Sequence, residues 1–382
     1  MNSIEWLSRL VAIDTTSRNS NLPLIQLAKD WFEQHGLSMR LTYNEEQNKA
    51  NLVASLPAQS GDLSGGILLS GHTDVVPVDG QQWKTNPFSA VQIDDKIVGR
   101  GTCDMKGFLA VILSLVPYLQ NKSLQHAVHF ALSYDEEVGC HGARLLIADL
   151  QKAGIQPAAC IVGEPTNMQP VVAHKGIQLV RCRIHGQAAH SSLTPQACNA
   201  IEYAATIIHY LHTLATQLAQ EGPFDFNFDV PFTTLSVNSI QGGIAHNIIP
   251  AECEFYFEFR QLPEVKPAAI IEKIQAYIQT QLLPVMQKKY ATAAIELEMI
   301  ATVPSFEMSE TKAITDIKQR LSTDTKVHKV AYATEAGLFQ QAAIPTIVCG
   351  PGSIEQAHKP DEFVSIAQLE KCERALKQVI CS

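Results

Sequence analysis

The chain has 382 residues, of which 46% are hydrophobic and 18% are charged, and its formal net charge is −9. This composition is that of an ordinary globular protein, and the length predicts two domains. The sequence has no basic cluster, and no apolar run reaches the ~18 residues that a membrane-spanning helix requires. We therefore expect neither a nucleic-acid partner nor a membrane partner.

The nine cysteines are scattered along the chain and form no Cys-x-x-Cys pair. This pattern favours reduced, mostly buried thiols over a disulfide framework or a structural zinc site. The first residues, Met1 to Trp6, show neither the basic segment nor the apolar segment of a signal peptide. We expect a cytoplasmic protein.

Amphipathic patterns predict helices over residues 2–12 and 22–35, and an alternating run predicts a strand over 51–56. The next strand, 66–71, is short and apolar and is therefore expected to be buried.

A loop with His72 and Asp74 follows this buried strand. Loops at the carboxyl ends of buried parallel strands carry the sites of α/β proteins. If His72 binds a metal ion through one ring nitrogen, the other nitrogen needs an acceptor, and Asp74 is near enough to provide it. Taken alone, the pair fits an ordinary loop histidine and a turn-forming aspartate equally well.

Asp104 lies in a glycine-punctuated turn just before an apolar helix, Phe108 to Leu119. An aspartate in that position usually caps the helix. The alternative is a carboxylate that bridges metal ions.

Acidic residues also follow two further apolar strands. The strand over 127–133 is followed by Glu136 and Glu137, and the strand over 159–163 by Glu164. Consecutive acids at the end of a buried strand repel one another unless protons or cations compensate them. A metal ion explains this cluster better than a solvated loop does.

The spacing of these residues is regular: 32 residues separate His72 from Asp104, 33 separate Asp104 from Glu137, and 27 separate Glu137 from Glu164. Each interval is about the length of one βα unit, which returns the chain to the same edge of a parallel sheet. We therefore predict an α/β fold with a mostly parallel sheet flanked by helices.

The pattern changes near Lys175, where strands begin to alternate as they do in a sheet with one exposed face. We predict strands over 176–185, 233–240, 251–260 and 294–300, and helices over 199–218 and 263–289. This order predicts a smaller α+β domain over 177–301, inserted between two catalytic segments, 1–176 and 302–382. The second catalytic segment is expected to contain a helix near 310–321, a strand over 344–349, a loop with His358, and a helix over 364–380.

The candidate ligands are two imidazoles and three carboxylates: His72, Asp104, Glu137, Glu164 and His358. Such mixed nitrogen and oxygen donors suit zinc, and a carboxylate shared by two ions is common in co-catalytic sites. Glu136 is adjacent to a ligand without being needed as one, so it is the natural general base. The chemistry that this set predicts is hydrolysis of an amide bond.

Six segments resemble the dinuclear-zinc peptidase and deacylase family: Gly71–Pro77, Gly101–Gly107, Asp135–Glu137, Gly163–Thr166, Gly186–Ser192 and Ala357–Glu362. The resemblance implies a zinc-peptidase type of catalytic domain with two zinc ions per subunit, for which cobalt is an expected substitute. It implies that His72 and Glu164 hold one ion, that Glu137 and His358 hold the other, and that Asp104 bridges them. It further implies that Asp74 orients His72 and that Glu136 is the general base.

The same resemblance implies a homodimer formed through the inserted domain. His190 is expected to reach the active site of the partner subunit and to donate to the oxyanion. Arg260 is expected to grip a substrate carboxylate with its fork-shaped guanidinium, and Asn247 to line the same site.

Three segments, His174–Gly176, Ala333–Ala336 and Gly350–His358, are similar to the branch of the family that deacetylates N2-acetyl-L-ornithine in arginine biosynthesis. From this similarity we expect Glu335 to meet the cationic side chain of the substrate and Gly352 to line the substrate site. The segment Ala245–Pro250 is more similar to the wider family.

Two alternatives remain open. The chain could act on another small N-acyl amino acid, such as N-succinyl-diaminopimelate, or on a dipeptide. It could also be a non-catalytic metal-binding or dimerisation protein, although such a protein would not need Glu136.

Overall fold

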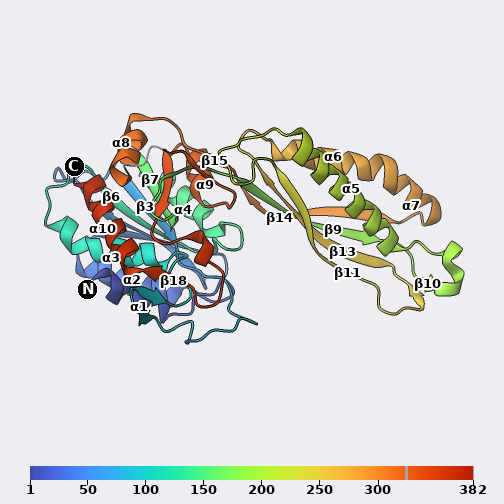
Figure 1. Cartoon of the computed structure of the whole chain (residues 1–382), viewed down its shortest axis with the longest axis horizontal. Helices are drawn as coiled ribbons and strands as arrows, with labels where there is room; N and C mark the ends of the chain where they lie inside the picture. The colour runs from blue at the N-terminus through green and yellow to red at the C-terminus, as the bar shows by residue number, and fades with distance from the viewer. Residues whose placement is uncertain (323–325, 382) are drawn as a thin grey trace. The chain divides into compact units, whose positions relative to one another are not determined.

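The computed structural model describes residues 1–322 and 326–381. The chain divides into two compact units (Figure 1). The first unit contains Met1–Ala173, Phe306–His328 and Thr334–Ser382, and the second contains His174–Ser305 and Lys329–Ala333. The inserted domain predicted over 177–301 lies within the second unit, which is slightly longer at both ends.

The segment Lys329–Ala333 belongs to the second unit, whereas the sequence placed it in the catalytic segment 302–382. The ammonium group of Lys329 pairs with Asp225 at 2.7 Å, and the main-chain carbonyl of Val330 accepts from the N–H of Lys175 at 3.3 Å. Both partners are more than a hundred residues away along the chain, so no local pattern in this short segment could indicate them.

The first unit is built on a nine-stranded sheet with the order β1-β2-β6-β3-β7-β17-β8-β15, in which β16 also pairs with β8. Its strands are β1 (Ser38–Tyr43), β2 (Ala50–Leu56), β3 (Ile67–His72), β6 (Val128–Ser133), β7 (Ala159–Pro165), β8 (Val171–His174), β15 (Phe306–Glu307) and β17 (Thr346–Gly350), together with β16 (His328–Val330), of which only His328 is assigned to the first unit. The four central strands β6, β3, β7 and β17 are parallel to one another. Their carboxyl ends therefore meet at one edge of the sheet, as the spacing of the acidic residues predicted.

Helices cover both faces of this sheet. They are α1 (Ser3–Val11), α2 (Leu22–Gln34), α3 (Lys106–Gln120), α4 (His141–Lys152), α8 (Lys312–Leu321), α9 (Ala336–Gln341) and α10 (Ile366–Ile380). One apolar core joins α1, α2, α3, α8 and α10 to the sheet, while α4 and α9 pack outside this core against β2, β6 and β17. Because α3 is buried on nearly all sides, its sequence is apolar throughout rather than amphipathic.

A small antiparallel sheet, β18-β5-β4, lies beside the main one in the chain's first unit. Its strands are β4 (Val91–Ile93), β5 (Lys96–Val98) and β18 (Phe363–Ser365). The pairing of β5 with β18 joins the segment that precedes Asp104 to the segment that follows His358.

The second unit has a four-stranded antiparallel sheet with the order β11-β13-β9-β14 and a two-stranded pair, β10 with β12. Its elements are β9 (Gly176–His185), β10 (Ala189–His190), α5 (Ala200–Glu221), β11 (Thr234–Gly242), β12 (Ile248–Ile249), β13 (Glu252–Gln261), α6 (Pro267–Tyr277), α7 (Leu283–Lys289) and β14 (Ala294–Val303). The helices pack on one face of the sheet, where β13 contributes the buried side chains of Phe255, Phe257 and Phe259.

The single helix predicted over 263–289 is two helices, α6 and α7, joined by a π-helical segment, Ile278–Leu282. Pro284 in the first turn of α7 explains the interruption, because proline has no N–H to donate within a continuous helix.

Among the residues that the structure describes, no helix combines the length and the apolar character needed to cross a membrane.

Candidate metal centre

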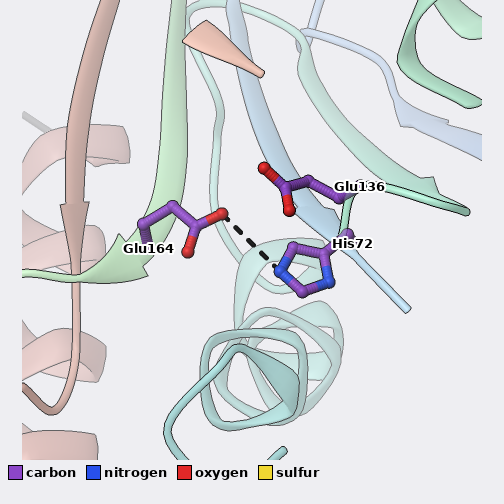
Figure 2. A group of neighbouring side chains, drawn as sticks. All are labelled: His72, Glu136 and Glu164. Atoms are coloured by element: carbon purple, nitrogen blue, oxygen red, sulfur yellow. Dashed lines mark ion pairs between the residues drawn. The ribbon is translucent and has the colours of Figure 1, made fainter. Parts of the chain in front are cut away.

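The carboxyl edge of the parallel sheet brings together His72, Glu136 and Glu164, whose side chains point toward one another in Figure 2. His72 is the last residue of β3, Glu164 is the second-to-last residue of β7, and Glu136 follows β6. The Nε2 atom of His72 lies 3.6 Å from Oε1 of Glu164. One potential ligand atom from each of the three residues lies within 4.8 Å of the other two.

Asp104 lies between two histidines. Its Oδ1 is 3.0 Å from Nε2 of His72, and its Oδ2 is 3.3 Å from Nε2 of His358. The same nitrogen of His358 lies 3.2 Å from Oε2 of Glu137. Met105, not Asp104, caps α3, so the carboxylate of Asp104 faces the histidines and is not used as a helix cap. This is the geometry that a bridging carboxylate needs.

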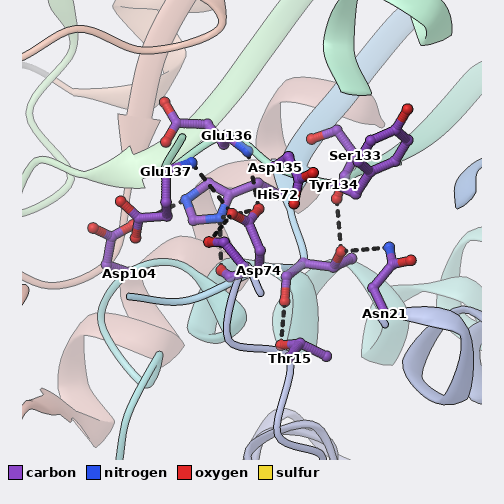
Figure 3. Close-up of polar contacts among 12 residues, drawn as sticks. Thr15, Asn21, His72, Asp74, Asp104, Ser133, Tyr134, Asp135, Glu136 and Glu137 are labelled. Carbon is purple, nitrogen blue, oxygen red and sulfur yellow. Dashed lines mark hydrogen bonds and ion pairs between the residues drawn. The ribbon is translucent and has the colours of Figure 1, made fainter. Parts of the chain in front are cut away.

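Asp74 contacts the site differently from the prediction. The Nδ1–H of His72 donates to the main-chain carbonyl of Asp74 at 2.9 Å, whereas the nearest carboxylate oxygen is 3.5 Å away. The carboxylate accepts the main-chain N–H groups of Glu136 at 3.0 Å and Glu137 at 3.2 Å (Figure 3). It also accepts the hydroxyl of Ser17 at 2.7 Å. The main chain of Asp74 therefore orients His72, and its side chain fixes the turn that presents both glutamates. Ser17 was not predictable as a partner of Asp74, because the two residues are 57 positions apart and no local pattern connects them.

The site is strongly negative, and its ligands are buried except for His358, whose side chain is 53% exposed. Burial raises the pKa of Glu137 to about 7, and it raises the pKa values of Glu136 and Glu164 well above their usual range. Burial also opposes ionisation of Asp104, but hydrogen bonds from His358 and His72 keep its pKa below the usual range. Hydrogen bonds to Asp104 and Glu137 raise the pKa of His358 to about 10. The raised pKa values of the three glutamates and of His358 are those expected where buried carboxylates outnumber positive charges, an excess that bound cations would compensate.

The donor set fits divalent metal ions. The buried Oε1 of Glu137 has no hydrogen-bond partner among residues 1–322 and 326–381, so this oxygen is free to bind an ion. Imidazole nitrogens and carboxylate oxygens are the ligands with which proteins hold zinc at hydrolytic sites. Two groups of three candidate ligands share His72, one with Glu136 and Glu164 and the other with Asp104 and Glu137.

Glu335 was expected to meet the amine of the substrate, but it lies in the interior of the first unit. Glu335 is 1% exposed. One of its carboxylate oxygens accepts a hydrogen bond from the hydroxyl of Ser133, and the other accepts one from the hydroxyl of Ser70 at 3.3 Å. Ser70 belongs to β3 and Ser133 ends β6. Glu335 therefore links two strands that carry the site, and the contacts of its carboxylate in this structure are with the two serines.

Gly352 lies beside the turn that carries Asp104. Its φ is +88°, and a Cβ atom at this position would lie 2.6 Å from Sγ of Cys103. Backbone conformation and close packing both require glycine here, which accounts for this residue without a substrate contact.

His190 lies in the second unit and is exposed. Its Nδ1 accepts the main-chain N–H of Ser192 at 3.2 Å and caps a short helical turn, Ser191–Gln196. A main-chain N–H can only donate, so the neutral ring carries its proton on Nε2. Asn247 is in the adjacent loop, where its carbonyl accepts the N–H of Ser191 at 3.0 Å.

Arg260 is also in the second unit, near the end of β13. Its Nε donates to Glu258 at 3.0 Å, and a third of its side chain is exposed. The two terminal nitrogens of the guanidinium are the ones with which an arginine can bind a carboxylate bidentately.

The fold and the buried N/O ligand cluster are those of a metal-dependent hydrolase of amide bonds. Residues 68–382 match the family described as peptidase family M20/M25/M40, and the chain belongs to this family.

Relatives of known function match almost the whole chain. The acetylornithine deacetylase of Proteus mirabilis (strain HI4320) is 36% identical over 373 residues, which are 97% of this chain and 92% of that protein. The acetylornithine deacetylase of Shigella sonnei (strain Ss046) is 34% identical over 94% of this chain and 91% of its own length.

Solved structures share the fold. An M20 family metallo-carboxypeptidase from Sulfolobus solfataricus is similar with a TM-score of 0.78 and 18% identity, covering 100% of this chain and 98% of its own. A dinuclear metal binding peptidase of the M20 family from Bacillus subtilis has a TM-score of 0.66 and 17% identity, covering 99% and 96%.

Proposed function

We infer that the protein is a metal-dependent amidohydrolase that removes the acetyl group from N2-acetyl-L-ornithine, giving L-ornithine and acetate in arginine biosynthesis. The observation that carries the hydrolytic part is Asp104, one oxygen of which faces His72 and the other His358, inside a buried cluster of carboxylates. The choice of substrate is supported by relatives named for this activity at 36% and 34% identity.

We propose that the site holds two zinc ions. His72 and Glu164 would bind one ion, Glu137 and His358 would bind the other, and Asp104 would bind both. When bound, the ions polarise the amide carbonyl and lower the pKa of the attacking water. Cobalt accepts the same nitrogen and oxygen donors and is an expected substitute.

Glu136 is proposed as the general base. Its main chain is fixed by the carboxylate of Asp74, and burial raises its pKa well above the usual range, which makes the carboxylate a stronger base. It would take a proton from the attacking water and give it to the nitrogen of the departing amine. Arg260 would hold the α-carboxylate of the substrate through its terminal guanidinium nitrogens.

We propose that the first unit is the catalytic domain and that the second is a dimerisation domain through which two copies associate. His190 would then donate its Nε2–H to the oxyanion in the partner's active site. The exposure of His190 and the main-chain N–H that fixes its tautomer support this role.

Mixing two inactive variants tests this arrangement. Glu136→Ala lacks the base but keeps His190, and His190→Ala lacks the donor but keeps the base. If each site takes His190 from the other subunit, a mixed dimer regains one complete site, and random exchange restores about a quarter of the wild-type activity. Sites that use their own His190 would give no recovery.

Amine release by the zinc-loaded protein from N2-acetyl-ornithine, N-acetyl-methionine and N-succinyl-diaminopimelate tests the substrate. We expect kcat/KM to be highest for N2-acetyl-ornithine by about tenfold or more, a difference that a site built to bind a charged group readily provides. A higher value for another substrate would keep the mechanism and reject this specificity. Absence of turnover on all three would favour the non-catalytic alternative.

A further inference from the structure

The two proposed ions differ in how their ligands are supported. His72 ends β3 and Glu164 belongs to β7, and these neighbouring strands are held together by their own ladder of main-chain hydrogen bonds. Asp104 and His358 lie in loops instead, and His358 has a left-handed backbone with φ of +62°. Loop-borne ligands need another support if they are to keep a metal-binding geometry.

Glu362 provides such support on the Asp104 side. Its Oε1 accepts the main-chain N–H of Cys103 at 2.9 Å and that of Asp104 at 3.0 Å. Its Oε2 accepts the main-chain N–H of Gly101 at 3.0 Å and Nη1 of Arg100 at 2.7 Å. One buried carboxylate thus accepts four hydrogen bonds from the turn that presents the bridging carboxylate.

Arg100 continues the connection toward His358. Its Nη2 donates to Oε1 of Gln81 at 2.6 Å, and Nε1 of Trp83 donates to the same oxygen at 3.0 Å. These two donors fix the orientation of the Gln81 amide, because its oxygen must face them. The Nε2 of Gln81 consequently points the other way and donates to the main-chain carbonyl of His358 at 2.9 Å.

A continuous series of hydrogen bonds therefore runs from the N–H of Asp104, through Glu362, Arg100 and Gln81, to the carbonyl of His358. The side chains of Arg100 and Glu362 are each 1% exposed, so solvent does not compete for their pairing. Near this series, β5 pairs with β18 and the N–H of Lys84 donates to Asp361 at 2.9 Å.

We propose that Gln81, Arg100 and Glu362 form a positioning network that sets the separation of Asp104 and His358 and thereby controls the binding of the second ion. The proposal rests on the dinuclear site proposed above. None of the three residues is a proposed metal ligand. They act through the main chains of Asp104 and His358. Both proposed ions share Asp104, but the first also has two strand-borne ligands, His72 and Glu164, so the larger effect is expected at the second ion.

The test is a titration of metal-free protein with Zn²⁺ by isothermal calorimetry, together with metal analysis after dialysis. Wild-type protein should bind two ions, and His358→Ala identifies the second binding event by removing it. Gln81→Leu should weaken that event about tenfold and leave the first within about twofold, since loss of a group that orients a ligand typically costs ~10–100-fold in affinity.

Gln82→Leu is the matched control, because Gln82 is an exposed glutamine adjacent to Gln81 and takes no part in the network. Glu362→Gln should weaken the second ion more strongly than Gln81→Leu does, because it turns N–H donors toward other N–H donors. Gln81 is only half-buried, so Gln81→Leu remains informative if Glu362→Gln, at a buried position, prevents folding.

If Gln81→Leu bound each ion with the same affinity as wild-type protein, the positioning network would be overturned. An equal loss of affinity at the two ions would overturn it as well. Wild-type protein that binds fewer than two ions would overturn the dinuclear site itself, so the two failures are distinguishable.

Discussion

The two units each contain a cluster of charged side chains, and the clusters differ in burial and in balance. In the first unit, four carboxylates and two histidines make up the metal centre, where the side chains of His72, Asp104 and Glu164 are 1%, 6% and 5% exposed. In the second unit, the outer face of the sheet carries an ion-pair ladder of Arg181, Arg183, His185, Glu252, Glu254, Glu296 and Glu298.

The ladder is more exposed and its charge is better balanced, since two arginines and a histidine face four glutamates. Arg183 pairs with Glu298 at 2.9 Å, with side chains 38% and 44% exposed, and His185 pairs with Glu252 at 2.7 Å. Exposed ion pairs of this kind contribute little to stability because water screens them. The buried cluster has an excess of negative charge that water does not screen, so it has a strong affinity for cations. Burial with unbalanced charge, and not the number of acids, marks the functional site.

Removal of metal ions should have the largest effect, because it acts on the buried cluster and leaves the exposed ladder unchanged. Treatment with a chelator should abolish turnover and lower Tm by about 5 °C or more, because ligands that bind only the folded state stabilise it by mass action. Activity and calorimetry before and after addition of Zn²⁺ measure both effects. An unchanged Tm would mean that the buried carboxylates do not depend on cations.

Glu136→Ala separates proton transfer from charge compensation within the buried cluster. We expect kcat to fall by about 10²–10⁴-fold, the usual contribution of a positioned general base, while two ions remain bound. Kinetics and metal analysis of the same sample provide the two readings, and exposed Glu264→Ala is the control. Loss of an ion in Glu136→Ala would instead make Glu136 a ligand, for which its distance from His72 is suitable.

Glu335→Gln tests whether a buried acid that is already hydrogen-bonded takes part in binding. Glu335 accepts hydrogen bonds from Ser70 and Ser133, and the substitution replaces one acceptor oxygen with an NH2 donor. We therefore expect the free energy of unfolding to fall by ~1–3 kcal/mol. The ratio of kcat/KM for N2-acetyl-ornithine and N-acetyl-methionine should stay within about twofold of wild type. Urea unfolding and this ratio measure the two effects. A large fall in this kcat/KM ratio without a loss of stability would show that Glu335 contributes to substrate binding.

Arg183→Gln in the exposed ladder should have the smallest effect. We expect Tm to change by less than about 3 °C, and the change should vanish in high salt because the pair is screened. Thermal unfolding at low and high NaCl concentrations measures this. A large shift that persists in salt would show that the ladder is as important to folding as the buried cluster.

The parallel core and its ligand edge were predictable from sequence because β3, β6 and β7 are short apolar strands whose ends recur at βα spacing. The pattern for α4 was also present, since Leu146, Ile147 and Leu150 recur at helical spacing, but it was not recognised next to the acidic turn. Edge strand β1 alternates only weakly between half-buried and exposed residues and gave no comparable signal.

The contacts that orient the ligands were not predictable, because their partners are distant in sequence. The carboxylate of Asp74 binds the turn after β6, and Glu335 reaches serines 202 and 265 residues away. Residue type indicated which side chains could bind a metal, whereas only the folded sheet determines which of them face it. Glu335 illustrates this: the motif that contains it is compatible with either the surface or the interior, and only the fold shows its contacts with Ser70 and Ser133.

The position of β17 has a consequence for synthesis of the chain on the ribosome. β17 pairs with β7, yet it is made about 180 residues later, after the whole continuous part of the second unit. At ~5–20 residues per second, the second unit has several seconds in which to fold while β7 still presents an unpaired edge. Only when β17 and the following loop emerge can His358 join the other ligands. The nascent protein therefore cannot complete the proposed second ion site before almost the entire chain has been translated.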